Sequence, residues 1–232
     1  MRPVDKGMSP YQAIPAYADA LPHLEKAIGC YCSYCEMPLA HVPEVEHKES
    51  KNSGGSLTDW NNLLLACKYC NTRKKEKIKQ GEAAQAIWPD TDNTFLAYSY
   101  THGVPVLNRT VLSQYGSQVE GKARRLFEAV VLDNRPSSSG DKDRRWRLRL
   151  EAFAVAREAL QDWRTVKGSE AAEAAERLII RQAQAKGFFS IWMMVFADEP
   201  EIKNALITAF PGTARMCFDA EGAPLHRIGG SI

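Results

Sequence analysis

The sequence lacks any long apolar segment. Its longest apolar run extends from Gly187 to Ala197, well short of the roughly 20 residues that a membrane-spanning helix needs. Nothing near the start resembles a signal peptide. These absences predict a soluble, cytoplasmic protein with no membrane partner. A reducing cytoplasm disfavours structural disulfides, so clustered cysteines are expected to bind metal.

A large excess of either charge is also missing. The 232 residues include 30 Lys and Arg against 28 Asp and Glu, which gives a formal net charge of +2. This balance excludes a uniformly basic nucleic-acid-binding protein, so any contact with nucleic acid must come from local clusters. The hydrophobic content of 44% is enough for a real core, and the length allows one large or two small domains.

Four of the six cysteines form two C-x2-C pairs: Cys32 with Cys35, and Cys67 with Cys70. Two such pairs suit a tetrahedral zinc, because each pair can turn two thiolates toward one ion. The segment between them, Glu36 to Ala66, is longer than the roughly 15 to 20 residues of a simple zinc ribbon. A further element is therefore inserted between the pairs.

The two remaining cysteines, Cys30 and Cys217, are expected to be ordinary small thiols. Cys30 is separated from Cys32 by a single residue, which leaves some doubt about the register of the first pair. The C-x2-C spacing favours Cys32 with Cys35.

The inserted element and the residues after the second pair resemble the HNH nuclease family. The family pattern is C-x2-C, an acidic residue followed by His, then N-L, then C-x2-C-[NH]-x2-K. In this sequence the corresponding residues are Cys32 to Cys35, Glu46-His47, Asn62-Leu63, and Cys67 to Lys74. Glu46 stands where the family often has Asp, and Asn71 stands where many members have His.

This resemblance implies an α+β fold, in which a zinc-stapled, treble-clef-like ββα-metal motif is followed by a mainly α-helical domain. Glu46 and Asn71 would hold a catalytic Mg²⁺ or Mn²⁺, and His47 would deprotonate the attacking water. Asn62 would orient the loop or the imidazole without touching substrate. By the same analogy, the products would carry a 5′-phosphate and a 3′-hydroxyl.

Other polar residues near the motif leave alternatives open. Glu44 is either a second metal ligand or, as we expect, solvated surface. The basic run is expected to bind phosphates near the cut, although a solvated helix face is the alternative; it comprises Lys68, Arg73, Lys74, Lys75, Lys77 and Lys79. A second basic cluster either contacts nucleic acid or a protein partner, or is a solvated face with a buried Trp146; it comprises Arg144, Arg145, Arg147 and Arg149.

We expect three regions: an irregular lead-in over residues 1–29 with a short helix near Leu24 to Ile28, an HNH domain with structural zinc over 30–105, and a helical domain over 106–232. Short strands and a turn are expected between Gly81 and Asn108. Apolar periodicity, helix-forming composition and end residues together predict five later helices: Val111 to Leu132, Asp141 to about Val166 (with Trp146, Leu150, Phe153 and Leu160 on one face), Ser169 to Lys186, a buried helix within Gly187 to Ala197, and Pro200 to just before Pro211.

A narrower resemblance is to the PtuB-type HNH proteins of Septu and retron-linked antiphage systems. It rests on Cys32 to Glu36, Val45 to His47 and Asp59 to Cys67, with a looser likeness later in the chain. Such proteins work with a PtuA-like ATPase partner. No phosphate-binding P-loop is visible in this sequence, so ATP chemistry would be supplied in trans, with the helical domain as the docking region.

The sequence therefore predicts an HNH endonuclease acting on DNA, with RNA or tRNA as the other possible substrate. The alternative is a non-catalytic zinc module that binds nucleic acid or protein through its basic helix. That alternative leaves the co-occurrence of Glu46, His47, Asn62 and Asn71 unexplained.

Overall fold

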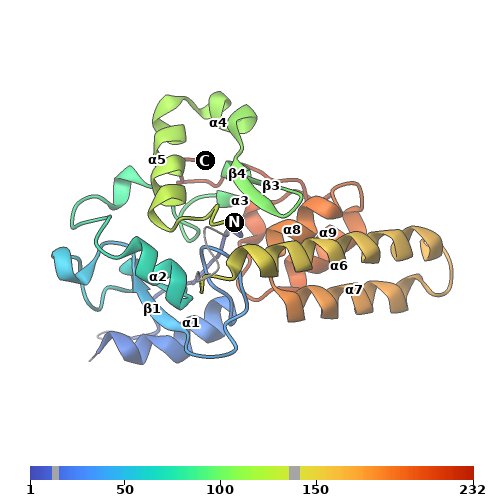
Figure 1. Ribbon diagram of the computed structural model, residues 1–232, viewed down its shortest axis with the longest axis horizontal. Helices are drawn as coiled ribbons and strands as arrows, with labels where there is room; N and C mark the ends of the chain where they lie inside the picture. Colours follow the sequence, from blue (N-terminus) through green and yellow to red (C-terminus); the bar gives the residue numbers. More distant parts are fainter. Residues whose placement is uncertain (12–15, 136–141) are drawn as a thin grey trace.

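The computed structural model describes residues 1–11, 16–135 and 142–232 (Figure 1). Helices in it are combined with two small antiparallel sheets, in agreement with a mixed α and β composition. The helices and strands are α1 (Leu21–Ile28), β1 (Glu44–His47), β2 (Leu63–Ala66), α2 (Lys68–Lys74), α3 (Thr94–Ala97), β3 (Tyr98–Thr101), β4 (Val104–Leu107), α4 (Arg109–Tyr115), α5 (Ser117–Ala129), α6 (Arg145–Val166), α7 (Ala172–Lys186), α8 (Phe189–Val195) and α9 (Pro200–Ala209).

The first sheet pairs β1 with β2, and its register places Glu46 opposite Leu64 and His47 opposite Leu63. Every residue of β2 is buried, because α1 packs against this strand. Full burial of a leucine side chain contributes about 1.5–3 kcal/mol, so three consecutive leucines make β2 a firm base for its partner. The polar strand β1 is therefore held in place by an apolar one.

Helix α2 follows β2 almost directly. Cys67 is its N-cap, and the cysteine Sγ accepts a hydrogen bond from the backbone N–H of Cys70. The helix ends where Lys75 adopts a positive φ of 43°. A seven-residue helix of this kind is too short to be stable alone, so it depends on its packing beside β1.

The expected strands between Gly81 and Asn108 are confirmed as the hairpin of β3 and β4. Its turn contains His102 and Gly103, both with positive φ. The expected helix over Val111 to Leu132 is divided at Gly116 (φ 88°) into α4 and α5, whereas Gly121 lies within α5. The segment from Pro136 to Asp141, which includes the expected first residue of the next helix, lies outside the described residues.

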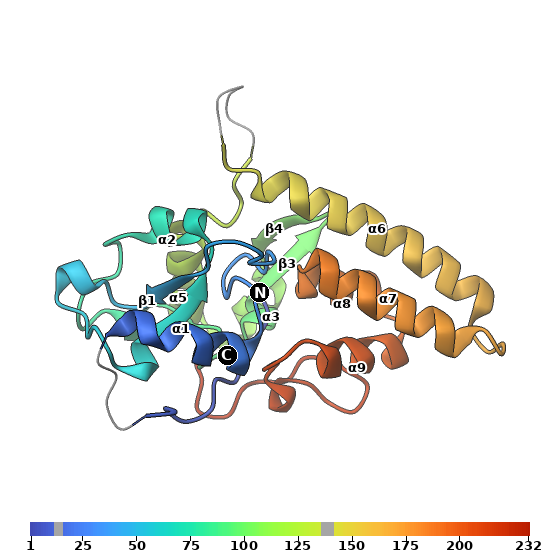
Figure 2. The same ribbon diagram turned by 90° about the horizontal axis from the view of Figure 1, so that it is seen from below.

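The C-terminal half contains the expected helices. Figure 2 shows α6 and α7 running side by side away from the rest of the molecule, with α8 and α9 nearer the centre. The buried side of α6 differs from the expected one: Leu150 is exposed and Trp146 only half-buried, whereas Arg145 and Arg149 are fully buried. The solvated arginine face considered for this helix is therefore wrong at those two positions.

The junction of α7 and α8 approaches the first cysteine pair closely. Gly187 ends α7 with a φ of 69°, and a Cβ added there would lie 2.6 Å from the Glu36 carbonyl oxygen. The next residue, Phe188, donates its backbone N–H to the same oxygen at 2.9 Å. Glycine is thus required here both for its backbone conformation and for its missing side chain.

The buried apolar side chains form two clusters that do not divide at residue 105. The first runs from Met1 through Leu132 and also contains Ala152, Phe188, Ile191 and Ile232. The second joins α6 to α9 with the segment around Phe218. Helices α4 and α5 therefore share the core of the strand-containing half, because Leu112, Leu126 and neighbouring side chains pack into it.

The lead-in is part of this first cluster, and the short helix expected within it is present as α1. Among the helices of the described residues, none is long and apolar enough to cross a membrane.

Candidate functional site

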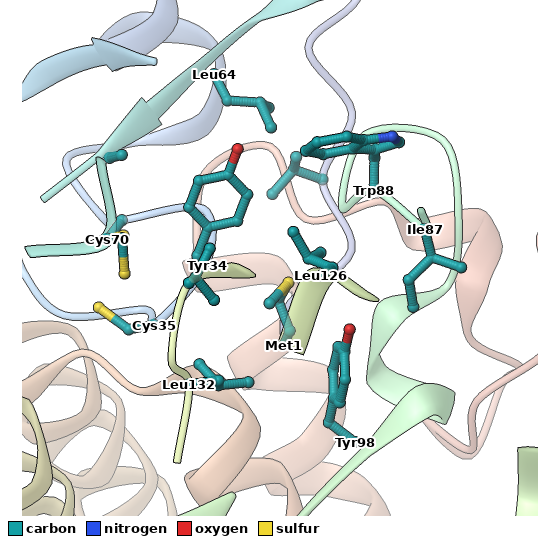
Figure 3. Close-up of a cluster of buried hydrophobic side chains, with 14 of the residues drawn as sticks. Met1, Tyr34, Cys35, Leu64, Cys70, Ile87, Trp88, Tyr98, Leu126 and Leu132 are labelled. Carbon is teal, nitrogen blue, oxygen red and sulfur yellow. The ribbon is translucent and has the colours of Figure 1, made fainter. Parts of the chain in front are cut away.

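Four cysteine sulfur atoms form a compact, buried cluster. The Sγ atoms of Cys32, Cys35, Cys67 and Cys70 lie within 4.8 Å of one another. Cys35 Sγ and Cys67 Sγ are 3.7 Å apart, close to the roughly 3.8 Å expected for two thiolates on a tetrahedral zinc with Zn–S bonds of about 2.3 Å. Figure 3 shows the Cys35 and Cys70 sulfur atoms beside Tyr34. The spacing, burial and all-sulfur donor set fit a structural zinc ion.

The backbone makes this cluster in two different ways. In the first pair, the N–H of Glu36 donates to the Cys32 carbonyl at 2.9 Å, and Glu36 takes a left-handed φ of 65° to close the turn. In the second pair, the first turn of α2 brings Cys70 to Cys67. Cys30 is exposed and stands outside the cluster, while Cys217 is buried elsewhere. This resolves the register in favour of Cys32 with Cys35.

A cavity of about 690 Å³ lies beside the cluster. Three parts of the chain form its walls: strand β1, the start of the following loop and one side of α2. Residues near Tyr17 close a further side. Its lining contains Glu44, Glu46, His47 and Asn71 together, so the cavity collects the candidate catalytic residues.

His47 is fixed in orientation by the loop that follows its strand. Its Nε2 lies 3.0 Å from the Leu57 carbonyl oxygen. A carbonyl oxygen only accepts, so in the neutral ring Nε2 carries the proton and Nδ1 keeps its lone pair. Burial lowers the pKa of His47 from its ordinary value of 6.5, despite the opposing effect of that hydrogen bond. The imidazole is therefore neutral, and able to accept a proton, at pH 7.

Asn62 holds this loop from its far end. Its amide donates to the Glu49 and Ser56 carbonyl oxygens at 3.1 and 2.8 Å, and its Oδ1 accepts the Glu49 N–H at 2.8 Å. The side chain is buried and is not part of the cavity lining. Asn62 thus orients the loop that in turn orients His47, and all of its described contacts are with backbone.

Glu44 is not the solvated surface residue that we expect from the sequence. Its Oε2 accepts a hydrogen bond from Asn71 Nδ2 at 2.6 Å, and its Oε1 lies 3.0 Å from Lys68 Nζ. The Glu44 side chain is only 19% exposed. Glu44 and Glu46 point to the same side of β1, as residues two apart on a strand do. Glu44 is therefore the carboxylate in direct contact with Asn71.

Glu46 is bound more deeply, in an ion pair with Lys74. Its Oε1 lies 2.7 Å from Lys74 Nζ, and the ammonium also donates to the His47 carbonyl at 2.7 Å. Burial raises the pKa of Glu46 to about 7, although Lys74 and the Tyr34 hydroxyl oppose the shift. Lys74 is 0% exposed, which contradicts the expectation that it contacts phosphate. Its ammonium instead supports β1 from α2.

The other basic residues of α2 and its extension differ in position. Lys68 and Lys75 line the cavity, and Arg73 and Lys79 are exposed on the surface. Lys77 donates to the Glu128 and Ala129 carbonyl oxygens. Of the basic run expected to bind phosphates, only Lys68 and Lys75 line the cavity, so the cavity is less basic than the sequence suggests.

The N-terminal segment contributes a wall that sequence reasoning misses. Tyr17 makes an edge-to-face contact with His47 at 5.1 Å between ring centroids, and Lys51 Nζ lies 3.9 Å from the centre of the Tyr17 ring. Lys51 also lines the cavity. No spacing signal connects Tyr17 to the HNH pattern, because the contact depends on how the proline-rich lead-in folds back.

Residues 32–77 match the family model of HNH endonucleases. The matched segment includes both cysteine pairs, β1, β2 and α2, which together form the cysteine cluster and most of the cavity wall. No curated protein and no solved structure matches the chain. The chain thus contains an HNH endonuclease domain of 46 residues (from 32 to 77, inclusive), with the rest of the fold built around it.

The cluster geometry predicts which cysteine near the first pair is required for zinc. Wild-type protein should contain about one zinc per chain, Cys30→Ser should keep it, and Cys32→Ser should lose it. Metal analysis of the purified proteins by mass spectrometry measures the content. Loss of zinc from the Cys30 variant with retention in the Cys32 variant would show that the register is wrong.

Proposed function

We propose that this chain is a metal-dependent HNH endonuclease that hydrolyses phosphodiester bonds in nucleic acid. The observation that carries this proposal is the position of His47, which has an unprotonated Nδ1 and lines the same cavity as Glu44 and Asn71. A neutral imidazole beside oxygen ligands provides a general base next to a cation site. The family match over residues 32–77 supports the same reaction.

In this proposal β1, β2 and α2 constitute the ββα-metal motif, with a treble-clef-like arrangement around a structural zinc. Four cysteine ligands complete a tetrahedral shell and leave no position for substrate. Hydrolysis therefore takes place in the neighbouring cavity, and the zinc keeps β1 and α2 in their relative positions.

Glu44, Glu46 and Asn71 are the residues that would hold a catalytic Mg²⁺ or Mn²⁺. Carboxylate and amide oxygens suit these hard cations. Asn71 donates its amide N–H to Glu44, which leaves its amide oxygen as the donor atom for a cation. When bound, the ion would stabilise the charge that develops on the phosphate and on the departing oxygen.

His47 accepts the proton of the attacking water at Nδ1. The Leu57 carbonyl keeps the opposite ring nitrogen protonated, so proton transfer can occur on one side of the ring only. Asn62 keeps this loop in place through its three backbone hydrogen bonds. The ring is thus aligned before substrate arrives, which lowers the cost of reaching the reactive geometry.

The basic side chains of the cavity position the phosphate backbone. Lys51, Lys68 and Lys75 line it, and ammonium groups at such sites contact phosphate oxygens without reading sequence. Arg73 extends this set on the exposed side of α2. We propose DNA as the substrate, and RNA is the second polymer to be tested.

We further propose that the nuclease works in an antiphage complex, as the effector beside a PtuA-like ATPase. The motifs shared with PtuB-type proteins support this assignment.

Substitution of His47 tests the proposed reaction. With Mg²⁺ or Mn²⁺, wild-type protein should cleave plasmid DNA or a tRNA pool, and His47→Ala should reduce the rate by about 10²–10⁴-fold, as expected for loss of a general base. His41→Ala is the matched control, because His41 is exposed and does not line the cavity. The assay is run with and without the ATPase partner.

Equal cleavage by the His47→Ala and wild-type proteins would rule out this mechanism. Zinc-loaded protein that cuts neither polymer, alone or with its partner, would instead favour the non-catalytic zinc module.

The rate of cleavage should fall only in acid. Burial lowers the pKa of His47 from 6.5, and only the neutral ring accepts a proton. Burial raises the pKa of Glu46 to about 7 in the metal-free protein, but saturating metal competes with the proton and keeps this carboxylate ionised. The rate should therefore be constant near pH 7 to 8 and decline with a midpoint below the ordinary histidine value of about 6.5. A pH–rate profile at saturating metal measures this midpoint. A midpoint above 7 would contradict the assigned role of His47.

A further inference from the structure

Arg145, the first residue of α6, makes direct contact with the cysteine cluster. Its Nη1 donates to Cys70 Sγ at 3.2 Å, and the same nitrogen donates to the Val130 carbonyl at 3.0 Å. Nη2 donates to the Val131 carbonyl and to Asp143, and Nε also donates to Asp143. All five N–H donors of a guanidinium are thereby used, although the side chain is 0% exposed.

Arg149 lies one helical turn further along α6 and is 1% exposed. Its Nη2 donates to Asn134, but Nε and Nη1 have no hydrogen-bond partner among the described residues. Burial lowers the pKa of Arg149, as does the charge of Arg145, whereas the negative charges of Cys35, Tyr100 and Cys70 oppose this shift. A buried cation with two unpaired donor atoms is costly, so a nearby concentration of negative charge is needed to keep it there.

A zinc ion with four cysteine thiolates provides that charge, since its formal charge is −2. The aspartate beside Arg145 offsets one positive charge, which leaves Arg149 as the buried arginine of α6 without a carboxylate in an ion pair within the described part of the chain. Burial of a doubly negative centre is unfavourable unless cations or hydrogen-bond donors compensate it. The two guanidinium groups and the zinc–thiolate cluster therefore each reduce the free-energy cost of burying the other.

We propose that Arg145 and Arg149 are positioning residues for the zinc centre: Arg145 donates to the Cys70 thiolate, and both guanidinium groups compensate the charge of the tetracysteinate site. The contact joins α6 to the HNH domain through the metal. Lysine could not replace Arg145, because one ammonium group cannot serve Cys70, Asp143 and two carbonyl oxygens in a fixed planar arrangement. Cys70 directly precedes Asn71, so the contact also fixes the start of the cavity wall.

The charge pattern in the sequence is consistent with this role. Arg144, Arg145, Arg147 and Arg149 are close together, yet only Arg145 and Arg149, four residues apart, are buried. Arg147 is paired with Glu151 and its side chain is 58% exposed. One helix therefore supplies both the test residues and a matched control.

Cobalt substitution and zinc release test the proposal in the full-length chain. Arg145→Met should release zinc to a chromogenic chelator about tenfold faster or more, in line with the effect of removing partners of metal ligands. In the Co²⁺-loaded protein, loss of the hydrogen bond to Cys70 Sγ should move the sulfur-to-cobalt charge-transfer band to longer wavelength. Arg147→Met should keep the zinc-release rate within about twofold of wild type and leave the charge-transfer band unshifted, as expected for an exposed surface pair.

Arg149→Met is the second variant, for use if Arg145→Met does not fold. It removes the charge but few hydrogen bonds, and its band should shift in the same direction by a smaller amount. Release rates and spectra equal to those of wild type in the folded variants would overturn the proposal. A wild-type protein that shows no charge-transfer band with Co²⁺ would instead refute metal binding by the cysteines, on which this proposal rests.

Discussion

The contact among four cysteine sulfur atoms is the interaction on which the rest of the fold depends. It joins the turn at Cys32–Cys35 to the start of α2, and each side is also tied to the helical half. Glu36 accepts hydrogen bonds from Phe188 N–H and from the Ser190 N–H and hydroxyl, while Cys70 accepts one from Arg145. The cluster therefore lies at the junction between the HNH domain and the helices, rather than at the edge of a separate module.

The strand β1 extends from this cluster and carries the residues that we propose to be catalytic. Glu44 and Glu46 project toward α2, where Asn71 and Lys74 meet them. His47 is held by the carbonyl of the following loop instead. Because side chains alternate along a strand, the carboxylates of Glu44 and Glu46 and the imidazole of His47 leave β1 in different directions. All three residues nevertheless line the cavity between the strand and α2.

Local spacing was sufficient to predict the cysteine pairs, the position of His47 beside Glu46, and most of the later helices. The C-x2-C pairs are local in sequence, and residues at the helix ends locate α7 and α9, because Gly187 ends the first and Pro200 begins the second. Whether Glu44 or Glu46 contacts Asn71 depends on how β1 is positioned along α2, and no sequence pattern indicates this position. The sequence places Lys74 on a phosphate-binding surface, and Arg145 and Arg149 on a surface that contacts nucleic acid, a partner or solvent, because a buried cation is recognisable only once its partners in distant segments are known. Tyr17 was missed for the same reason, and so was the core shared across residue 105.

Hydrogen exchange measured on the zinc-loaded and the chelator-treated chain tests most directly whether the metal centre unites the two halves. If it does, removal of zinc should reduce protection in β1, β2 and α2, and also in the first turns of α6 and in α8, which contact the cluster through Arg145 and Glu36. Loss of protection confined to residues 32–77, with α6 and α8 unchanged, would contradict the account and describe a zinc module that folds independently of its helical neighbours.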